Sequence, residues 1–168
     1  GICLLTFSGC KEDPAEPAVE ASPVISTFYL IRHAEKVRSD PENKDPELNQ
    51  SGLGRAMHWA EIFDDVPFDA IYSTDYARTT MTAAPTAVKK DITVTYYDPE
   101  MLGMETFKAE NLGKKVLIVG HSNSTPDMVN RLTGEDKYAP MEDSDNGTLF
   151  IVTLSGSEHS VARLQFNP

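Results

Sequence analysis

Several side chains of the kinds that bind or attack phosphate stand directly after apolar, strand-like runs of this sequence. Arg32 and His33 end the first run, Arg78 comes shortly after the second, and His121 follows the fourth. A neutral imidazole attacks phosphorus well near neutral pH, because its pKa lies close to that range. Guanidinium groups bind phosphoryl oxygens bidentately and stabilise the charge of the transition state. This set of residue types predicts phosphoryl-transfer chemistry, in which a second, partly protonated imidazole adds a further hydrogen-bond donor.

A carboxyl group is expected to complete such a site. It would protonate the leaving oxygen and then deprotonate the attacking water. Asp98, after the third strand-like run, is the first candidate; Glu100 is the next and Glu105 is more remote. A zinc site of His33, His121 and Asp98 is an alternative. Two arginines in the same pocket would repel a dication, so we expect neither a metal nor another cofactor.

The functional side chains meet only if the runs that precede them belong to one sheet. From Val24 onward, β-branched and aromatic runs alternate with helix-like segments, which predicts a three-layer α/β/α domain with a mostly parallel sheet. Ligands of such sheets bind beyond the carboxyl ends of the strands, where these side chains would converge. The expected strands are 24–32, 68–74, 91–97 and 115–120, with a terminal hairpin of 147–154 and 160–165 around Ser155-Gly156.

Helix signals fill the intervals between the strands. The expected helices cover about 49–64, 76–89, 105–112 and 124–132. Asn49 or Ser51 is expected to cap the first helix, and Ser73 or Asp75 the second. Pro85 should kink the second helix or lie near one of its ends. The apolar side of the first helix is expected to hold Leu53, Met57, Ala60 and either Ile62 or Phe63.

Composition excludes several classes of function. The chain has 168 residues and a formal net charge of -11, which fits one globular domain and opposes binding to nucleic acid or to membranes through a basic patch. Its two cysteines, Cys3 and Cys10, both lie in the first ten residues. The remaining chain therefore has no disulfide framework, no cysteine zinc site and no thiol nucleophile.

The first 23 residues are expected to lie outside the folded domain. Residues 1–10 are apolar and end in small residues before Cys10, which resembles the end of a bacterial lipoprotein signal peptide with a lipidated cysteine. The alternative is a first β-strand. Residues 11–23 carry three prolines and four acids and are expected to form a tether before a domain of residues 24–168. These features predict a protein anchored by lipid at Cys10 in a bacterial envelope, facing the periplasm or the surface.

Four ordered motifs resemble the histidine phosphatase superfamily, also called phosphoglycerate mutase-like. Arg32-His33-Ala34-Glu35 is similar to its R-H-G/A-E signature, and residues 48–56 resemble its L-T-x-x-G-x-x-Q-A helix start. Residues 73–83 resemble its S-D/P-L-x-R-A-x-x-T-A block, and residues 119–122 resemble its V-x-H-G/S ending. The resemblance implies that fold and a phosphatase that needs no metal and acts through phosphohistidine.

The resemblance also implies a role for individual residues. His33 would be the nucleophile, and Arg32, Arg78 and His121 would form the phosphate pocket. Beside His121, Ser122 and Asn123 are expected to bind substrate. The family places its acid after the third strand, which again points to Asp98 and then to Glu100. The loops 36–47 and 134–146 are expected to face the substrate, and the acids of the second loop would repel a polyphosphate unless they point away.

Three functions remain open at this stage. The first is hydrolysis of phosphate monoesters, on a small molecule or a phosphoprotein. The second is a catalytically weak module that binds phosphorylated ligands, and the third is an envelope protein without a functional pocket. The short chain leaves little room for the insertions that shape the substrate sites of mutases and of large acid phosphatases. The sequence does not determine the oligomeric state.

Overall fold

The computed structural model describes residues 9–10 and 22–167, which form a three-layer α/β/α sandwich. Its six-stranded sheet has the order β3-β2-β4-β1-β5-β6. The pairs β3-β2, β2-β4 and β4-β1 are parallel, and β5 and β6 add an antiparallel hairpin. The predicted fold class is thereby confirmed. The strands are β1 Ile25–Arg32, β2 Ala70–Ser73, β3 Thr95–Tyr96, β4 Lys115–Gly120, β5 Thr148–Ser155 and β6 Glu158–Gln165.

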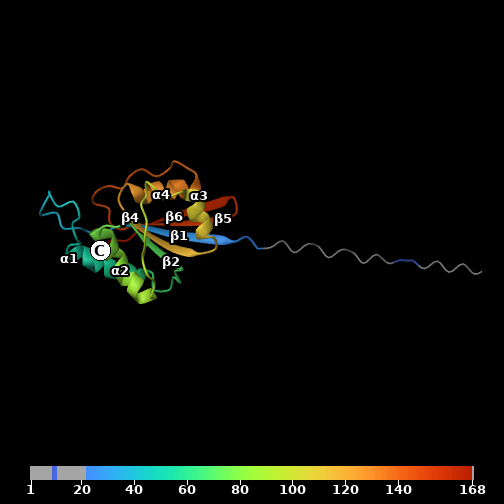
Figure 1. The fold of residues 1–168 in the computed structure, drawn as a ribbon, viewed down its shortest axis with the longest axis horizontal. Helices are drawn as coiled ribbons and strands as arrows, with labels where there is room; N and C mark the ends of the chain where they lie inside the picture. Colours follow the sequence, from blue (N-terminus) through green and yellow to red (C-terminus); the bar gives the residue numbers. More distant parts are fainter. Residues whose placement is uncertain (1–8, 11–21, 168) are drawn as a thin grey trace, which may run out of the picture.

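Helices cover both faces of the sheet, with α1 and α2 on one face and α3 and α4 on the other (Figure 1). This arrangement follows from side chains that alternate along the central strands. Phe28 and Leu30 of β1 pack in the cluster that contains residues of α3 and α4. Ile31 packs with Trp59 of α1 and Ala83 of α2. The helices are α1 Gln50–Ile62, α2 Ala77–Lys90, α3 Met104–Glu110 and α4 Ser124–Thr133.

The buried face of α1 differs from the predicted one. Leu53 is 46% exposed and Met57 is 61% exposed, so neither belongs to the core. The face against the sheet instead runs through small and aromatic residues at helical spacing: Gly52, Ala56, Trp59, Ala60 and Phe63. The bulk of Trp59 and Phe63 determines which side of the helix turns inward, and the glycine and alanines let the helix approach closely.

Two further predictions about the elements need correction. The third strand has two residues instead of seven, because β3 is the edge strand and pairs only with Tyr72 and Ser73 of the short β2. Neither Ser73 nor Asp75 caps α2. The backbone N–H of Ala77 donates to Asp45 Oδ1 of the β1–α1 loop at 2.8 Å, so the cap comes from a distant segment. Pro85 lies inside α2, which continues to Lys90.

The predicted signal-peptide remnant and tether lie mostly outside the described residues, which begin with Gly9 and Cys10 and resume at Ser22. Cys10 is exposed and is a free thiol. The boundaries of the leader, the tether and the domain therefore stay predictions. Within the described part of the chain, no helix combines the length and the apolar character that crossing a membrane requires.

Candidate active site

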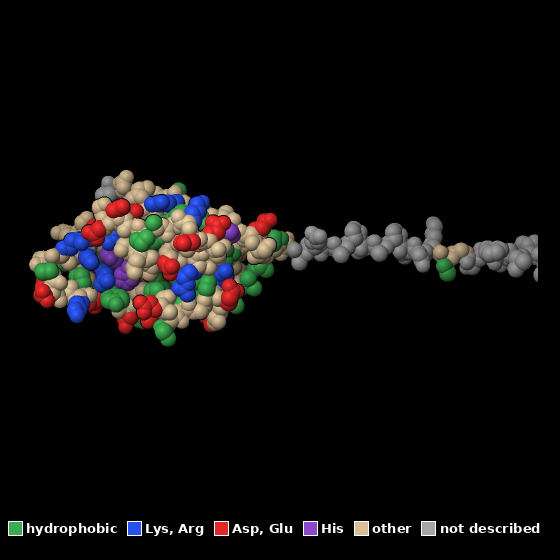
Figure 2. Space-filling view, turned by 90° about the horizontal axis from the view of Figure 1, so that it is seen from above, with side chains coloured by type: hydrophobic (Ala, Val, Ile, Leu, Met, Phe, Trp, Pro, Cys, Tyr) green, Lys and Arg blue, Asp and Glu red, His purple; other side chains and the backbone are tan. Residues whose placement is uncertain are grey.

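A pocket of about 690 Å³ opens at the carboxyl ends of β1, β2 and β4. This is the edge at which parallel sheets place their ligand sites. Figure 2 shows imidazole and basic side chains next to one another on the surface, with acidic side chains around them. The residues that line the pocket are Arg32, His33, Lys36, Thr74, Asp75, Tyr76, Arg78, Tyr97, Asp98, Pro99, Glu100, His121, Ser122, Asn123, Ser124 and Asp143. Every site residue that the sequence predicted, apart from the lipidation site Cys10 and the more remote Glu105, is among them.

His33 stands directly after β1 and is 3% exposed. Its Nδ1 lies 2.7 Å from the Ala34 carbonyl oxygen. A carbonyl only accepts, so Nδ1 carries the proton and Nε2 has a free lone pair. Burial lowers the pKa of His33 to about 3, and the charges of Arg32 and Arg78 act in the same direction. The imidazole is therefore neutral near pH 7, as a nucleophile must be.

The Arg32 guanidinium has two distinct edges. Its Nη1 donates to three backbone carbonyls of one loop, those of Glu142 at 3.2 Å, Asp143 at 2.9 Å and Asp145 at 2.8 Å. Nη2 lies 3.4 Å from the Asp143 carboxylate, and Nε is buried without a partner. Nη1 thus holds the loop, Nη2 pairs with Asp143, and Nε is left for an oxyanion.

Arg78 lies in the first turn of α2, where its guanidinium carbon stands 4.6 Å from the centre of the Tyr76 ring. Its Nε and Nη1 are buried without a hydrogen-bond partner, and Nη1 is 3.8 Å from the exposed Asp45 carboxylate. Burial lowers the pKa of Arg78, while Asp45 and Tyr76 counteract that shift. Unpaired buried donors of this kind are costly, which makes Arg78 a strong partner for an anion.

His121 follows β4 and faces His33, with 5.6 Å between the two ring centroids. Its Nε2 lies 2.8 Å from the Thr74 hydroxyl, which in turn donates to Thr79 Oγ1. Because the Thr74 proton is used there, Nε2 donates to Thr74 and carries a proton. Burial lowers the pKa of His121 to about 4, with Arg78 as the next cause. The expected partial protonation is wrong for the ligand-free pocket, since the neighbouring cations disfavour a further charge.

The candidate acids lie on the pocket wall between β3 and α3. Asp98 and Glu100 are both exposed, and Asp98 Oδ1 accepts the Glu100 N–H at 2.9 Å. Both carboxyl groups line the pocket, so each can reach a leaving group there. Glu105, the remoter candidate, does not line it. The geometry leaves the choice between Asp98 and Glu100 open.

Eight lining residues were not singled out individually for this pocket by the sequence, and four of them contact the predicted site residues or add a charge beside them. Lys36 adds a cation, and burial together with the charge of Arg78 lowers its pKa. Asp143 accepts from Arg38 at 3.1 Å as well as from Arg32, and these contacts hold its pKa below the ordinary value. Thr74 and Tyr76 contact His121. Lys36 and Asp143 belong to the two loops that were expected to face the substrate, and Thr74 stands at a strand end.

The zinc alternative is not supported by the arrangement of the side chains. Among residues 9–10 and 22–167, no three His, Cys, Asp or Glu side chains are grouped so that they could hold a metal ion. His33 Nδ1 is bonded to Ala34, and Arg32 and Arg78 stand in the same pocket. This donor set fits an anion rather than a cation.

Comparison of the sequence with protein families gives one match. A model of the histidine phosphatase superfamily (branch 1) matches residues 28–102. The matched segment contains Arg32, His33, Arg78 and two of the candidate acids, Asp98 and Glu100. No sequence among curated proteins matches the chain significantly.

Solved structures share the fold over most of this chain. A putative phosphohistidine phosphatase SixA from Agrobacterium tumefaciens has 20% identity and a TM-score of 0.61, with 84% of this chain and 99% of that chain covered. Phosphoglycerate mutase from Bacillus anthracis has 12% identity and a TM-score of 0.66, with 85% and 94% covered.

A third structure is a phosphoserine phosphatase mutant from Entamoeba histolytica, in complex with phosphoserine. It has 16% identity and a TM-score of 0.62, with 81% of this chain and 94% of that chain covered. At such identities the likeness shows the fold alone. The chain is thus similar to the histidine phosphatase superfamily over residues 28–102, within a domain of phosphoglycerate mutase-like fold.

Proposed function

We propose that this protein is a phosphatase that needs no metal and hydrolyses phosphate monoesters through a phosphohistidine on His33. The observation that carries the proposal is the pairing of a nucleophile with unpaired cations. His33 presents a neutral Nε2 to the pocket in which Arg32 Nε and Arg78 Nε and Nη1 are buried without partners. A phosphoryl group supplies the acceptors that these donors lack.

Two displacement steps account for the reaction. His33 Nε2 attacks phosphorus and forms the P–N bond, while the bond from phosphorus to the leaving oxygen breaks. Asp98 or Glu100 gives its proton to that oxygen. A water molecule then loses a proton to the same carboxylate and attacks phosphorus, and the P–N bond breaks. Arg32 and Arg78 hold the phosphoryl oxygens throughout, so that the charge of each transition state is stabilised in place. His121 joins them through Nδ1 when the bound phosphoryl group favours its protonated form.

The substrate class is proposed from the chemistry of the pocket and from its relatives. A neighbour in the structural comparison was solved as a mutant phosphoserine phosphatase with phosphoserine, and another is described as a putative phosphohistidine phosphatase. We therefore propose a small phosphorylated molecule or a phosphoprotein as the substrate. Ser122 and Asn123, at the start of α4, would bind its phosphate or leaving group.

Hydrolysis of p-nitrophenyl phosphate in EDTA tests this proposal. We expect product release by the wild type, loss of at least about a thousandfold of kcat in His33→Ala, and a trapped phosphoprotein that is acid-labile and alkali-stable. Retained activity in His33→Ala, or dependence of the wild type on added metal, would contradict the mechanism.

A catalytically weak phosphate-binding module is the second candidate. The exposure of both Asp98 and Glu100 favours it, because packing does not hold an exposed carboxyl group in one position against a leaving group. Calorimetry with a phosphate ester would then show binding without turnover, and no phosphohistidine would accumulate.

We also propose that Cys10 carries a lipid that anchors the domain in a bacterial envelope. The sequence before Cys10 and the exposed thiol of Cys10 support this. Mass spectrometry of the protein expressed from its natural gene would show the lipid on Cys10. An unmodified Cys10 that follows a retained leader would contradict the anchor.

A further inference from the structure

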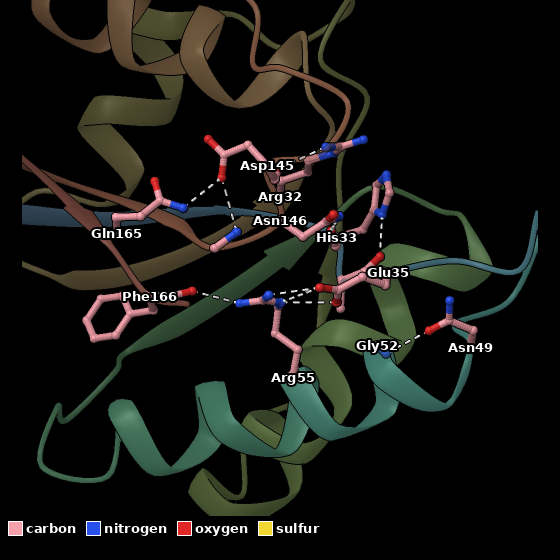
Figure 3. A network of polar contacts seen from close by, with 12 residues as sticks. Arg32, His33, Glu35, Asn49, Gly52, Arg55, Asp145, Asn146, Gln165 and Phe166 are labelled. Carbon is pink, nitrogen blue, oxygen red and sulfur yellow. Dashed lines mark hydrogen bonds and ion pairs between the residues drawn. The ribbon is translucent and has the colours of Figure 1, made fainter. Parts of the chain in front are cut away.

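An ion pair behind the pocket joins the nucleophile loop to helix α1 and to the end of the chain. Glu35, two residues after His33, accepts from Arg55 Nε at 2.9 and 3.0 Å and lies 2.8 Å from Arg55 Nη2. The third nitrogen of Arg55, Nη1, donates to the Phe166 carbonyl at 2.8 Å. Figure 3 shows Arg55 between Glu35 and Phe166. Neither Glu35 nor Arg55 lines the pocket, so they do not touch a bound phosphoryl group.

This contact is built into the protein. The Arg55 side chain is 9% exposed and that of Glu35 is 24% exposed. Gly147 packs closely against the other end of the Arg55 guanidinium. A Cβ at Gly147 would lie 2.1 Å from the Phe166 oxygen and 3.0 Å from Arg55 Nη1. Phe166 N–H donates to the Gly147 carbonyl at 2.7 Å, and the Phe166 ring packs on Trp59. All three nitrogens of one buried guanidinium are therefore used between segments far apart in the sequence.

The pair acts on His33 through the peptide that joins Ala34 to Glu35. The carbonyl of that peptide is the acceptor of the His33 Nδ1–H bond, which is the ring's one hydrogen bond among the described residues. Ala34 N–H is held by Thr82 Oγ1 at 2.9 Å on one side. On the other side, Glu35 is fixed by two contacts. Its side chain pairs with Arg55, and its backbone carbonyl accepts the Asn49 backbone N–H at 3.0 Å. A movement of Glu35 rotates the acceptor that orients the imidazole.

We propose that Glu35 and Arg55 are positioning residues that fix the orientation of His33 for in-line attack. The predicted effect on kcat rests on the proposed phosphatase function, whereas the predicted orientation of the His33 ring does not. Arg55 stands where the L-T-x-x-G-x-x-Q-A pattern has Gln. In this chain the contact to Glu35 is therefore a bidentate ion pair between a guanidinium and a carboxylate. Catalytic constellations require placement within about 0.5 Å, and a misplacement of about 1 Å costs roughly a hundredfold in rate.

The test combines kinetics with an observation of the imidazole itself. In Glu35→Gln and Arg55→Met we expect kcat for p-nitrophenyl phosphate to fall about tenfold or more. The competitive inhibition constant of inorganic phosphate should change by less than about twofold, because Arg32, Arg78 and His121 keep their places. The double variant should be no slower than the worse single variant, since both changes break one contact.

Nitrogen-15 NMR of the histidine rings gives a measurement that does not depend on turnover. The wild type should show His33 as the Nδ1–H tautomer with slow exchange of that proton, and the two variants should lose this signature. Glu35→Gln keeps the side-chain volume and one acceptor, so the test does not depend on Arg55→Met folding. Asp64→Asn is the control. It removes the ion pair between Asp64 and Lys89, which lies at the end of α2 far from Arg78, and it should change neither measurement.

The possible outcomes separate this inference from the proposed function. An active wild type whose variants keep kcat and the Nδ1–H signature would overturn the positioning role. So would a parallel loss of kcat, phosphate affinity and thermal stability, which marks a purely structural contact. If the wild type is inactive, the phosphatase proposal fails, and loss of the Nδ1–H signature in Glu35→Gln and Arg55→Met still supports the positioning of His33.

Discussion

Two imidazoles share one pocket with Arg32, Arg78 and Lys36, and this crowding of cations determines the state of each residue. Burial and the neighbouring charges keep His33 and His121 neutral, while Arg32 and Arg78 retain buried N–H groups without partners. A nucleophile and an anion-binding site therefore arise from the same arrangement. The charges that disfavour protonation of His33 are the charges that would hold the phosphoryl oxygens.

Replacement of Arg78 by Lys tests the geometry of its guanidinium separately from its charge. The ammonium group is a single point donor and cannot replace both Nε and Nη1, which stand unpaired in the pocket. We expect kcat/KM for p-nitrophenyl phosphate to fall by about a hundredfold, the cost of losing one preorganised donor pair. The thermal midpoint should change little, because lysine keeps a positive charge next to Asp45 and the two donors have no hydrogen bond to lose. Arg163→Lys, at an exposed position of β6, is the matched control and should keep wild-type kinetics; equal activity of the two variants would contradict the role of Arg78.

The lowered pKa of His33, about 3 against 6.5 in the unfolded chain, predicts acid sensitivity of the fold. Between those values the unfolded state binds one more proton than the native state, so the free energy of unfolding rises with pH and falls on acidification. From pH 6.5 to pH 5 we expect His33 to account for a loss of about 1.5 kcal/mol.

Denaturant unfolding at several pH values measures this loss. His33→Asn removes one of two buried imidazoles and should reduce the slope between pH 5 and pH 6.5, to which His121 also contributes because burial lowers its pKa to about 4. His58→Asn, at an exposed position of α1, should leave the slope as it is in the wild type. An unchanged slope in His33→Asn would show that His33 does not titrate as its burial requires.

The residues of the site differ in how far the sequence could predict them. Arg32, His33, Arg78 and His121 were predicted to converge, because each follows a strand of a parallel sheet and the carboxyl ends of such strands meet at one edge. Asp143 and the Glu35–Arg55 pair were not assigned a role. Arg32 and Asp143 are 111 residues apart in the sequence, and Glu35 and Arg55 are 20 residues apart. No local periodicity encodes such pairings.

At the scale of elements, the start of α1 holds the nucleophile loop against the sheet. Asn49 caps the helix by accepting the Gly52 N–H at 2.9 Å, and its own N–H donates to the Glu35 carbonyl (Figure 3). Gly52 lies so close to this loop that a Cβ would stand 2.0 Å from the Glu35 oxygen. The glycine is required by the contact between two backbones, since its position within the helix demands no special conformation.

Two glycines of α1 give a matched pair of variants. Gly52→Ala places a methyl group against the Glu35 backbone, and we expect a loss of about 3 kcal/mol or more in the free energy of unfolding. Gly54→Ala meets nothing within 4 Å and should stabilise the protein by about 1 kcal/mol, as alanine does in helix interiors. Denaturant unfolding of both variants is the measurement. Similar stabilities would show that the helix start is not in close contact with the loop.

The elements that were predicted well are those with strong local signals. β4 is apolar on both faces, and α4 ends at Gly134, whose φ of 74° suits glycine. β3 was predicted too long because its sequence favours a strand but its neighbour β2 offers only two positions for pairing. The buried face of α1 was predicted correctly at Ala60 and Phe63 and wrongly at Leu53 and Met57. Leu53 and Met57 match a helical period as well as Trp59 does, and tertiary packing selects between them.

At the scale of the whole molecule, the chain has a net charge of -11, and its pocket brings together Arg32, Lys36 and Arg78. Asp75, Asp98, Glu100 and Asp143 line the same pocket as the arginines. A single phosphoryl group between the arginines is favoured, whereas further negative charge on the leaving group meets this carboxylate rim. The expected repulsion of polyphosphates remains a prediction. Of the acids in loop 134–146 on which it was based, Asp143 lines the pocket, and Asp75, Asp98 and Glu100 add carboxylates from other segments.

A comparison of p-nitrophenyl phosphate with ATP tests the effect of the rim. At about 10 mM salt, where the screening length is about 30 Å, we expect kcat/KM for ATP to be at least about tenfold lower. At about 1 M salt the screening length is about 3 Å, so the charge effect should disappear. The ratio of the two kcat/KM values should then reflect only the different shapes of the substrates. Asp75→Asn removes one exposed rim charge, and it should narrow the ratio at low salt and leave it unchanged at high salt. A ratio that does not depend on salt would mean that the rim carboxylates play no part in selecting the substrate.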